Sequence, residues 1–224
     1  MNFFRHWAKN IIFLLVYIFA GGALVLIIDG LVSGSELTPF NTAAEVVMSH
    51  IRTPFLTDLF LFATNLGSPT VLIILTFGLA IYLLLKKDTY DAVLYLASIF
   101  LAVFALTVLK NMFDIPRPEY SLIHLASWSF PSGHATVATA FFFATGYTFI
   151  SKIRSAKGKL ALVLFCIFGA GMVCFSRVYL GAHWALDVLA GIALGLVCVT
   201  MVILVFNIFL EESKWRRRET RGIV

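Results

Sequence analysis

The chain has 224 residues, of which 60% are hydrophobic and only 13% are charged. Soluble globular chains are roughly 45–50% apolar and about 25% charged, so this composition excludes an ordinary water-soluble domain and indicates a polytopic membrane protein. The formal net charge of +5 does not indicate a nucleic-acid partner, because the cations fall in short clusters between apolar runs, a pattern typical of membrane topology. We expect one all-α membrane domain over residues 1–224.

Six apolar runs follow one another along the chain, each of a length that suits a membrane-spanning helix. A cleaved signal peptide is the alternative for the first run. However, this run exceeds the usual signal core of about 7–15 residues and no clear small-x-small site follows it, so we interpret it as a retained span. The predicted spans, gathered in one bundle, cover about residues 11–28, 69–85, 92–109, 135–151, 160–175 and 188–210.

The long connection between the first and second spans carries a weaker helical pattern. Apolar residues recur at roughly helical spacing from Thr42 to Asn65, which favours an amphipathic helix near the membrane interface. Pro54 is expected to kink this helix or split it in two. Pro69, after Gly67-Ser68, is well placed to begin the next helix.

The basic residues predict the orientation of the bundle. The positive-inside rule places both termini in the cytoplasm. Only Arg52, Lys110, Arg117 and Arg177 then lie on the outer side. The other Lys and Arg residues fall in the inner segments: Arg5, Lys9, Lys86, Lys87, Lys152, Arg154, Lys157, Lys159, Lys214, Arg216, Arg217, Arg218 and Arg221.

Three polar segments stand at the outer ends of the predicted spans. Ionisable groups beside a bilayer are costly and therefore indicate function. His183 and Asp187 are four residues apart, so on a helix they share one side, and the carboxylate can fix the imidazole tautomer and leave the other nitrogen as nucleophile or base. The segments are Lys110-x6-Arg117-Pro118, Pro131-Ser132-Gly133-His134 and Ser176-Arg177-x5-His183-x3-Asp187.

The same segments carry groups that suit a phosphate. Lys110, Arg117 and Arg177 would provide three fixed cations around the histidines, and guanidinium groups offer paired donors to phosphate oxygens. Ser132 and Gly133 stand where a helix begins, and the free backbone N–H groups at such a position favour an anion.

This three-part pattern resembles the signature of the type 2 phosphatidic acid phosphatase superfamily, which also includes soluble vanadium haloperoxidases. The resemblance implies that His183 attacks phosphorus and forms a phosphohistidine, that Asp187 orients it, and that His134 is the general acid and then the base. The phosphate would be bound by Lys110, Arg117, Ser132, Gly133 and Arg177, with Ser176 as a further candidate. We expect no metal and no cofactor, because the fixed cations would take that role and no carboxylate cluster is present.

A site at the outer edge of the bilayer meets lipid headgroups, so we expect a lipid phosphate partner and an integral lipid phosphatase of the plasma membrane. Undecaprenyl diphosphate is the favoured substrate, followed by phosphatidylglycerophosphate and phosphatidic acid. The alternatives are a lipid phosphotransferase with the same chemistry and a non-catalytic lipid-binding or transport protein that keeps the fold. Six spans disfavour a haloperoxidase.

Overall fold

The computed structural model describes the backbone of residues 2–33, 37–123 and 126–219, and the side chains of residues 9–33, 39–123 and 126–208. The described chain is all-α, as predicted, and contains eight helices. The side chain of Arg5 and those of the basic tail from Lys214 to Arg221 lie outside the described residues. The helices are α1 (Asn2–Val32), α2 (Leu37–Ile51), α3 (Pro54–Leu66), α4 (Pro69–Leu85), α5 (Thr89–Phe113), α6 (Gly133–Ile150), α7 (Ala156–Tyr179) and α8 (Ala185–Glu219).

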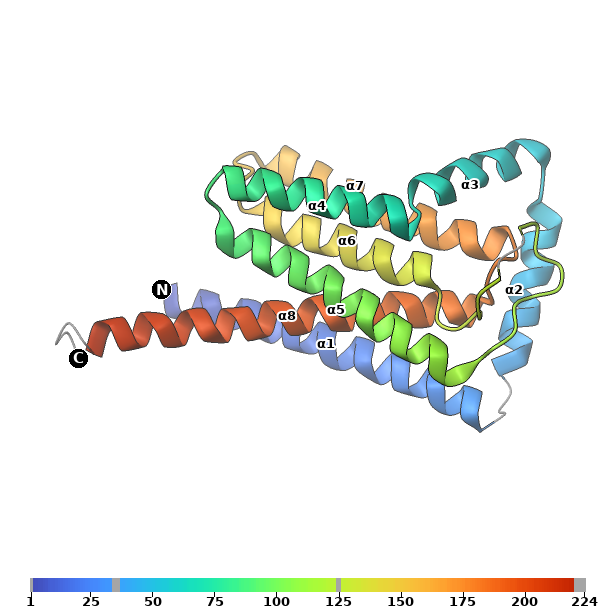
Figure 1. Ribbon diagram of the computed structural model, residues 1–224, viewed down its shortest axis with the longest axis horizontal. Coiled ribbons are helices and arrows are strands. Elements are labelled where there is room, and N and C mark those ends of the chain that lie inside the picture. The colour runs from blue at the N-terminus through green and yellow to red at the C-terminus, as the bar shows by residue number, and fades with distance from the viewer. Residues whose placement is uncertain (1, 34–36, 124–125, 220–224) are drawn as a thin grey trace.

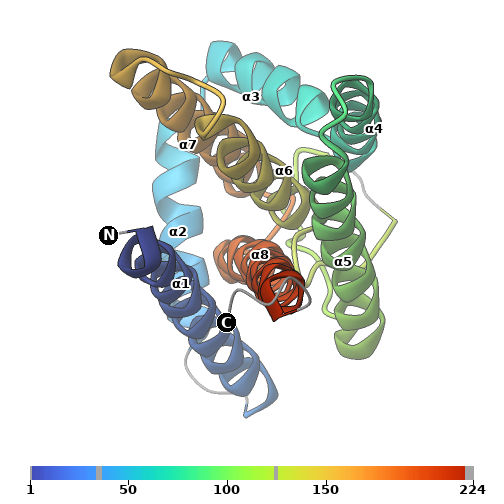
Figure 2. The ribbon, with the colours of Figure 1, turned by 90° about the vertical axis from the view of Figure 1, so that its left-hand side faces the viewer.

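Helices α1, α4, α5, α6, α7 and α8 run lengthwise as a bundle, and α2 crosses one end of it (Figure 1). Both chain ends lie at the opposite end, together with the α4–α5 and α6–α7 connections. Viewed along the bundle, α6 and α8 lie inside a ring formed by the other helices (Figure 2). The end covered by α2 is therefore where the α5–α6 and α7–α8 connections meet.

Capping residues explain where the first breaks between helices fall. Thr53 and Ser68 are extended N-cap residues whose hydroxyls accept N–H groups of the first turns of α3 and α4, and Pro54 and Pro69 follow them at the first helical position. A proline there loses no hydrogen bond, and its fixed φ suits a helix start. The predicted effect of Pro54 is confirmed in its stronger form, because the segment is split into two separate helices.

Length and composition alone identify membrane-spanning helices within the described chain. Four helices are long and apolar enough to cross a membrane, and the pair α3–α4, bent by 45°, makes a fifth if it forms one broken span. The four cover Lys9–Val32, Thr89–Phe113, Ala156–Tyr179 and Ala185–Ile208. Each predicted span coincides with a helix, and most of these helices extend a few residues past the purely apolar run because a helix continues through the interface.

Helix α6 differs from the others because it lies in the interior and is rich in threonine. Two of its hydroxyls, those of Thr136 and Thr145, donate to carbonyls four residues earlier at 2.9 and 2.7 Å, whereas those of Thr139 and Thr148 find no partner within the described residues. Other helices surround it, so most of its residues from Ala135 to Thr148 are buried. Such a helix has less apolar surface than a lipid-facing span needs.

Two glycines of α8 permit close contact with α6. A Cβ added at Gly191 would lie 2.7 Å from the carbonyl oxygen of Ser132, and one at Gly195 would lie 2.8 Å from that of Thr136. Small residues at this spacing let two helix backbones approach. The contact joins the start of α6 to the start of α8, where the Ser132 N–H donates to the Asp187 carbonyl at 3.0 Å.

Candidate active site

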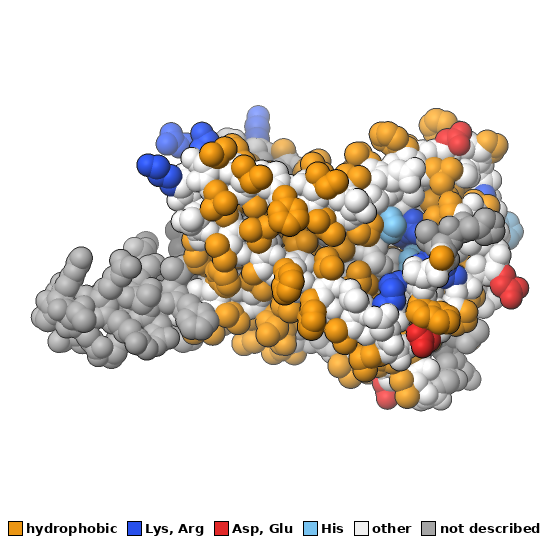
Figure 3. All heavy atoms as spheres, in the orientation of Figure 1, with side chains coloured by type: hydrophobic (Ala, Val, Ile, Leu, Met, Phe, Trp, Pro, Cys, Tyr) orange, Lys and Arg blue, Asp and Glu red, His pale blue; other side chains and the backbone are white. Residues whose placement is uncertain are grey.

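The three polar segments meet at the end of the bundle that α2 covers. Figure 3 shows basic and histidine side chains gathered in a recess at this end, while apolar side chains cover the flank of the bundle. Electrostatic interactions link His134, near the start of α6, with Arg177, His183, Arg117 and Lys110. The structure thus brings together side chains from the three segments that the sequence analysis singled out.

His183 is held by its neighbours from the Nδ1 side. Its Nδ1 lies 3.4 Å from Asp187 Oδ2 and 3.3 Å from the Ser129 hydroxyl, which itself donates to the same carboxylate oxygen. The Trp184 N–H also donates to Asp187 Oδ2, at 3.0 Å. Only 2% of His183 and of Asp187 is exposed. A buried carboxylate with these partners fixes the imidazole plane.

Arg117 determines the state of the other ring nitrogen. Its Nη1 lies 3.1 Å from His183 Nε2. Guanidinium has donors only, so Nε2 must accept and carry a lone pair, and the ring proton is on Nδ1, facing Asp187. Burial, followed by the positive charges of Arg117, Arg177 and Lys110, holds the pKa of His183 well below its usual value of 6.5. His183 is therefore neutral, with a lone pair on Nε2.

Arg177 is a buried cation whose hydrogen bonds are incomplete. Its side chain is 1% exposed, and Nη1 donates to the Thr64 hydroxyl of α3 at 2.7 Å. Within the described chain, neither Nε nor Nη2 has a hydrogen-bond partner. Buried polar groups are rarely left unsatisfied, and an uncompensated buried charge is costly. Two orphan donors on a guanidinium beside a histidine suit an oxyanion.

Comparison with known proteins decides the family. The model of the PAP2 superfamily matches residues 91–210, which is more than half of the chain. This chain belongs to the PAP2 superfamily. The phosphatidylglycerophosphatase B of Bacillus subtilis is 33% identical over 159 residues, which cover 68% of this chain and 76% of that protein. An undecaprenyl-diphosphatase of Sulfolobus acidocaldarius is 27% identical over 202 residues, covering 87% and 88%.

Solved structures of PAP2 enzymes have the same architecture. The crystal structure of a transmembrane PAP2-type phosphatidylglycerolphosphate phosphatase from Bacillus subtilis matches with a TM-score of 0.71 and 27% identity, over 85% of this chain and 93% of that chain. That of LpxE from Aquifex aeolicus has a TM-score of 0.57 and 28% identity, over 73% and 94%. The resemblance stated from the motifs is confirmed, and so is the predicted enzyme class, because the named relatives are phosphatases.

The remaining signature residues of this PAP2 chain differ in burial and in their hydrogen-bond partners. Lys110 Nζ donates to the Trp128 carbonyl at 2.6 Å, from a half-buried position at the mouth of the site. Ser132 is the N-cap of α6, and its buried hydroxyl finds no partner in the described part of the chain, while Gly133 is the first residue of the helix. Ser176, the further candidate, uses its hydroxyl on the Val173 carbonyl at 2.6 Å, so its proton is already engaged.

Sequence reasoning missed two residues of the site. Ser129 is fully buried beside the His183–Asp187 pair, and its position three residues before Ser132 was the one available signal. Thr64 holds Arg177 from α3, but its partner is 113 residues away and nothing in the local sequence marks it. Both residues assist the signature residues of the PAP2 superfamily from outside the three segments.

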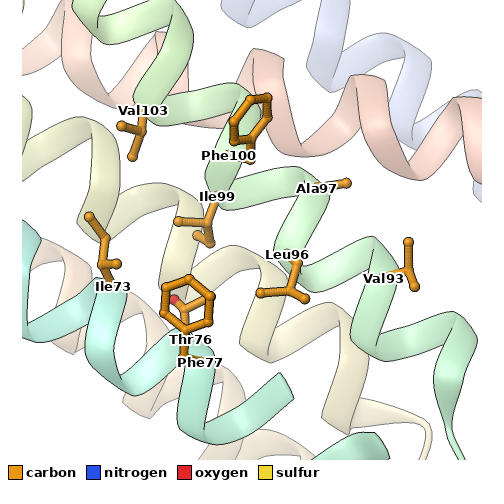
Figure 4. Close-up of a pocket in the computed structure, with 9 residues that line it drawn as sticks. All are labelled: Ile73, Thr76, Phe77, Val93, Leu96, Ala97, Ile99, Phe100 and Val103. Atoms are coloured by element: carbon orange, nitrogen blue, oxygen red, sulfur yellow. The ribbon is translucent and has the colours of Figure 1, made fainter. Parts of the chain in front are cut away.

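An apolar hollow elsewhere in this PAP2 chain carries no group for phosphate chemistry. It lies between α4 and α5, has a volume of about 490 Å³ and is lined by apolar side chains and Thr76 (Figure 4). The Thr76 hydroxyl already donates to the Leu72 carbonyl. This hollow has no group that could bind or transfer a phosphate. Within the described ranges, no three His, Cys, Asp or Glu side chains are grouped so that they could share a metal ion.

Proposed function

We propose that this chain is a metal-independent membrane lipid phosphatase that hydrolyses a phosphomonoester or diphosphate lipid through a phosphohistidine intermediate. The observation that carries the proposal is the 3.1 Å approach of Arg117 Nη1 to His183 Nε2, beside the two unpartnered donors of Arg177. We assign those donors and Arg117 Nη1 to the oxygens of a bound phosphate, so that Arg117 donates to the phosphate in place of Nε2 and the Nε2 lone pair is free to face phosphorus. Proximity of this kind is a major part of enzymatic rate enhancement.

In the proposed first step, His183 Nε2 attacks phosphorus and the bond from phosphorus to the leaving oxygen breaks. His134 donates a proton to that oxygen, which leaves as the lipid alcohol or, from a diphosphate, as the lipid monophosphate. Asp187 stabilises the positive charge that develops on the imidazole. Lys110, Arg117 and Arg177 neutralise the phosphoryl oxygens.

In the second step, water replaces the lipid at phosphorus. His134, now neutral, takes a proton from the water, the new P–O bond forms and the P–N bond to His183 breaks, so inorganic phosphate and free imidazole result. The Ser132 hydroxyl and the N–H groups at the start of α6 are assigned to the phosphoryl oxygens. Lys110 and Arg117 are half-buried whereas Arg177 and His183 are buried, so the anion is proposed to enter past the first pair.

The proposed topology has six spans, both termini in the cytoplasm and the site at the extracytoplasmic face of the plasma membrane. Its support is the distribution of charge: Lys86 and Lys87 and the basic α6–α7 connection lie at the end where both termini lie, opposite the site (Figure 1). Helix α2 would lie in the outer interface. Its exposed apolar side chains include Phe40, Val46 and Val47, which are 50, 50 and 56% exposed.

Undecaprenyl diphosphate is the proposed substrate, followed by phosphatidylglycerophosphate and phosphatidic acid. The printed names of the relatives support this choice, since they include an undecaprenyl-diphosphatase and a phosphatidylglycerophosphatase B. A lipid phosphotransferase is the alternative within the same chemistry, with a lipid hydroxyl in place of water. A non-catalytic lipid-binding protein is the other alternative. Lipid binding alone would not require the buried His183 and its contacts with Asp187 and Ser129.

The test is phosphate release by the purified chain in detergent with EDTA present. The three lipids are supplied separately at equal concentration, with His183→Ala as the paired variant. We expect release from at least one lipid and a loss of more than about 10³-fold in the variant, the scale at which removal of a nucleophile acts. Full activity of His183→Ala would refute the mechanism. Phosphorylated acceptor lipid without free phosphate would favour the phosphotransferase.

A further inference from the structure

Two long-range hydrogen bonds join α2 to the turn that carries His183. Asn41, near the start of α2, accepts the N–H of Leu186 at 3.1 Å, and Arg52, just past its end, donates from Nε to the Tyr179 carbonyl at 3.1 Å. Leu186 lies in the first turn of α8, and Tyr179 is the last residue of α7. The two contacts therefore flank the turn between these helices.

The contact at Asn41 supplies what the start of α8 lacks. The first N–H groups of a helix need acceptors, which an N-cap side chain normally provides to the second or third helical residue. Trp184 occupies the N-cap position of α8 and has no side-chain oxygen. Asp187 accepts the Trp184 N–H, and Asn41 from another helix accepts that of Leu186. Asn41 thus caps the helix that carries Asp187.

The contact at Arg52 does the same for the end of α7. The last carbonyls of a helix lack partners, and a cation there also suits the negative end of the helix dipole. Arg52 lies over the Tyr120 ring at 5.7 Å, and this ring packs against Gly181, whose φ is +65° and whose added Cβ would lie 2.9 Å from it. Arg52 thus supports the turn on two sides.

The neighbouring side chains make this corner rigid. Tyr179 is fully buried, its ring lies 4.5 Å from that of Phe60, and its hydroxyl accepts the Thr53 N–H at 3.1 Å. Asn41 and Arg52 are eleven positions apart, about 16 Å along a helix. Helix α2 therefore spans the turn and fixes both of its ends.

We propose that Asn41 and Arg52 are positioning residues, and that α2 is a brace that holds His183 and Asp187 at the right separation from Arg177. This inference rests on the proposed function, because it assigns these three residues to one phosphoryl-transfer site. It also accounts for Arg52, the outer cation that no signature segment contains. Neither residue touches the reacting atoms, so their loss acts on geometry.

The experiment measures hydrolysis of undecaprenyl diphosphate by the full chain in detergent. We expect Asn41→Ala and Arg52→Ala each to lower kcat by about 10- to 100-fold, the effect of a displacement of about 1 Å in a catalytic site, with KM changed less than about threefold. Asn41→Asp keeps the oxygen acceptor and suits the positive end of α8, so it should recover kcat to within about threefold of the wild type.

Two matched controls report on surface changes alone. Ser49 is exposed on α2 and bonds only to the Val46 carbonyl of its own helix, and Arg154 is an exposed cation at the other end of the bundle. Ser49→Ala and Arg154→Ala should have the same kcat and KM as the wild type. The brace is refuted if folded Asn41→Ala and Arg52→Ala also have the kcat of the wild type. It is equally refuted if the kcat of Asn41→Asp is as low as that of Asn41→Ala. If Asn41→Ala does not fold, Arg52→Ala decides by the same criterion.

Hydrogen exchange gives a readout that needs no activity. Loss of the Leu186 hydrogen bond, worth about 1 kcal/mol, should speed amide exchange in a peptide covering residues 180–188 about fivefold in Asn41→Ala, and not in Ser49→Ala. Unchanged exchange would refute the brace. An inactive wild type with this exchange pattern would instead refute the proposed function and leave the brace standing.

Discussion

The hydroxyl of Ser129 lies 3.3 Å from Nδ1 of His183, and it donates to the same Asp187 oxygen that faces this nitrogen. The serine is fully buried, and its own N–H is fixed on the Ile115 carbonyl at 2.7 Å. It therefore connects the α5–α6 loop to the proposed nucleophile. The Ser129 hydroxyl, the His183 ring and the Asp187 carboxylate are thus all within 3.4 Å of one another.

Replacing Ser129 by alanine should disturb the imidazole without removing a reacting group. Asp187 loses one of its two described donors and keeps only the Trp184 N–H, so it is held less firmly against His183. We therefore expect kcat to fall about 10- to 100-fold with little change in KM. Steady-state hydrolysis of the preferred lipid measures both constants. Ser129→Thr keeps the hydroxyl, so its kcat should be closer to that of the wild type. Equal kcat in Ser129→Ala and wild type would show that Asp187 needs no such partner.

Replacing Thr64 by valine should act mainly on phosphate affinity. Valine has nearly the shape of threonine but cannot accept from Arg177 Nη1. The guanidinium therefore loses the hydrogen bond of 2.7 Å that it makes to Thr64. A net loss of about 1–1.5 kcal/mol corresponds to about a five- to tenfold weaker inhibition by orthovanadate, a phosphate analogue. Thr64→Ser should retain the wild-type inhibition constant. An unchanged constant in Thr64→Val would mean that Arg177 is positioned by packing alone.

The pH dependence of kcat/KM should depend on the charges around His183. Protonated imidazole cannot attack, so kcat/KM falls on the acid side as the free enzyme binds this proton. Burial and then Arg117 lower the pKa of His183, so Arg117→Gln should raise that pKa and move the acid limb to higher pH. Ionisation of the substrate affects the wild type and Arg117→Gln equally. The difference in pH between their acid limbs therefore reports a change in the enzyme.

Arg117→Lys is the control for this shift, because it keeps the positive charge. Its acid limb should stay near that of the wild type even though its rate is lower. An acid limb of Arg117→Gln at the same or a lower pH than in the wild type would contradict the assignment of the limb to His183.

The contact between α6 and α8 should tolerate no added methyl group. Gly191→Ala would place a Cβ 2.7 Å from the Ser132 carbonyl, a backbone atom that cannot turn aside. Overpacking of this kind costs typically 1–3 kcal/mol, which thermal unfolding in detergent would show as a lower Tm. An added Cβ at Gly22 meets nothing within 4 Å, so Gly22→Ala should leave the Tm unchanged or slightly higher. Equal Tm values for the two variants would refute the close packing.

Local sequence rules predicted much of the arrangement because each depends on near neighbours. Thr53-Pro54 and Ser68-Pro69 mark helix starts through their own hydroxyls and rings, and Ser132 and Gly133 begin α6 as expected. The His183–Asp187 spacing of four residues predicted one shared side of a helix. The side chains do meet at 3.4 Å, but the helical premise was wrong, because His183 lies in the turn before α8, which begins at Ala185. Family membership, confirmed by comparison, rested on the same short segments.

What the sequence did not reveal depends on partners far along the chain. Asn41 accepts from Leu186, Arg52 donates to Tyr179 and Thr64 accepts from Arg177, and each pair is more than 100 residues apart. Periodicity describes the face of a helix but not its partner. The prediction of six spans is not confirmed, because four of the described helices, or five with the bent α3–α4 pair, are long and apolar enough to cross a membrane. Helix α6 is not among them, since it is buried among other helices and carries several threonines.

The central claim is that His183 becomes covalently phosphorylated, and a phosphoryl-trapping experiment tests it most directly. The purified chain is mixed with lipid diphosphate carrying ³²P in its terminal phosphate and quenched in alkali within milliseconds. We predict label on His183 that is stable to alkali and lost in acid, present in the wild type and absent from His183→Gln. Hydrolysis at the full rate without labelled protein, or label retained by His183→Gln, would contradict the account.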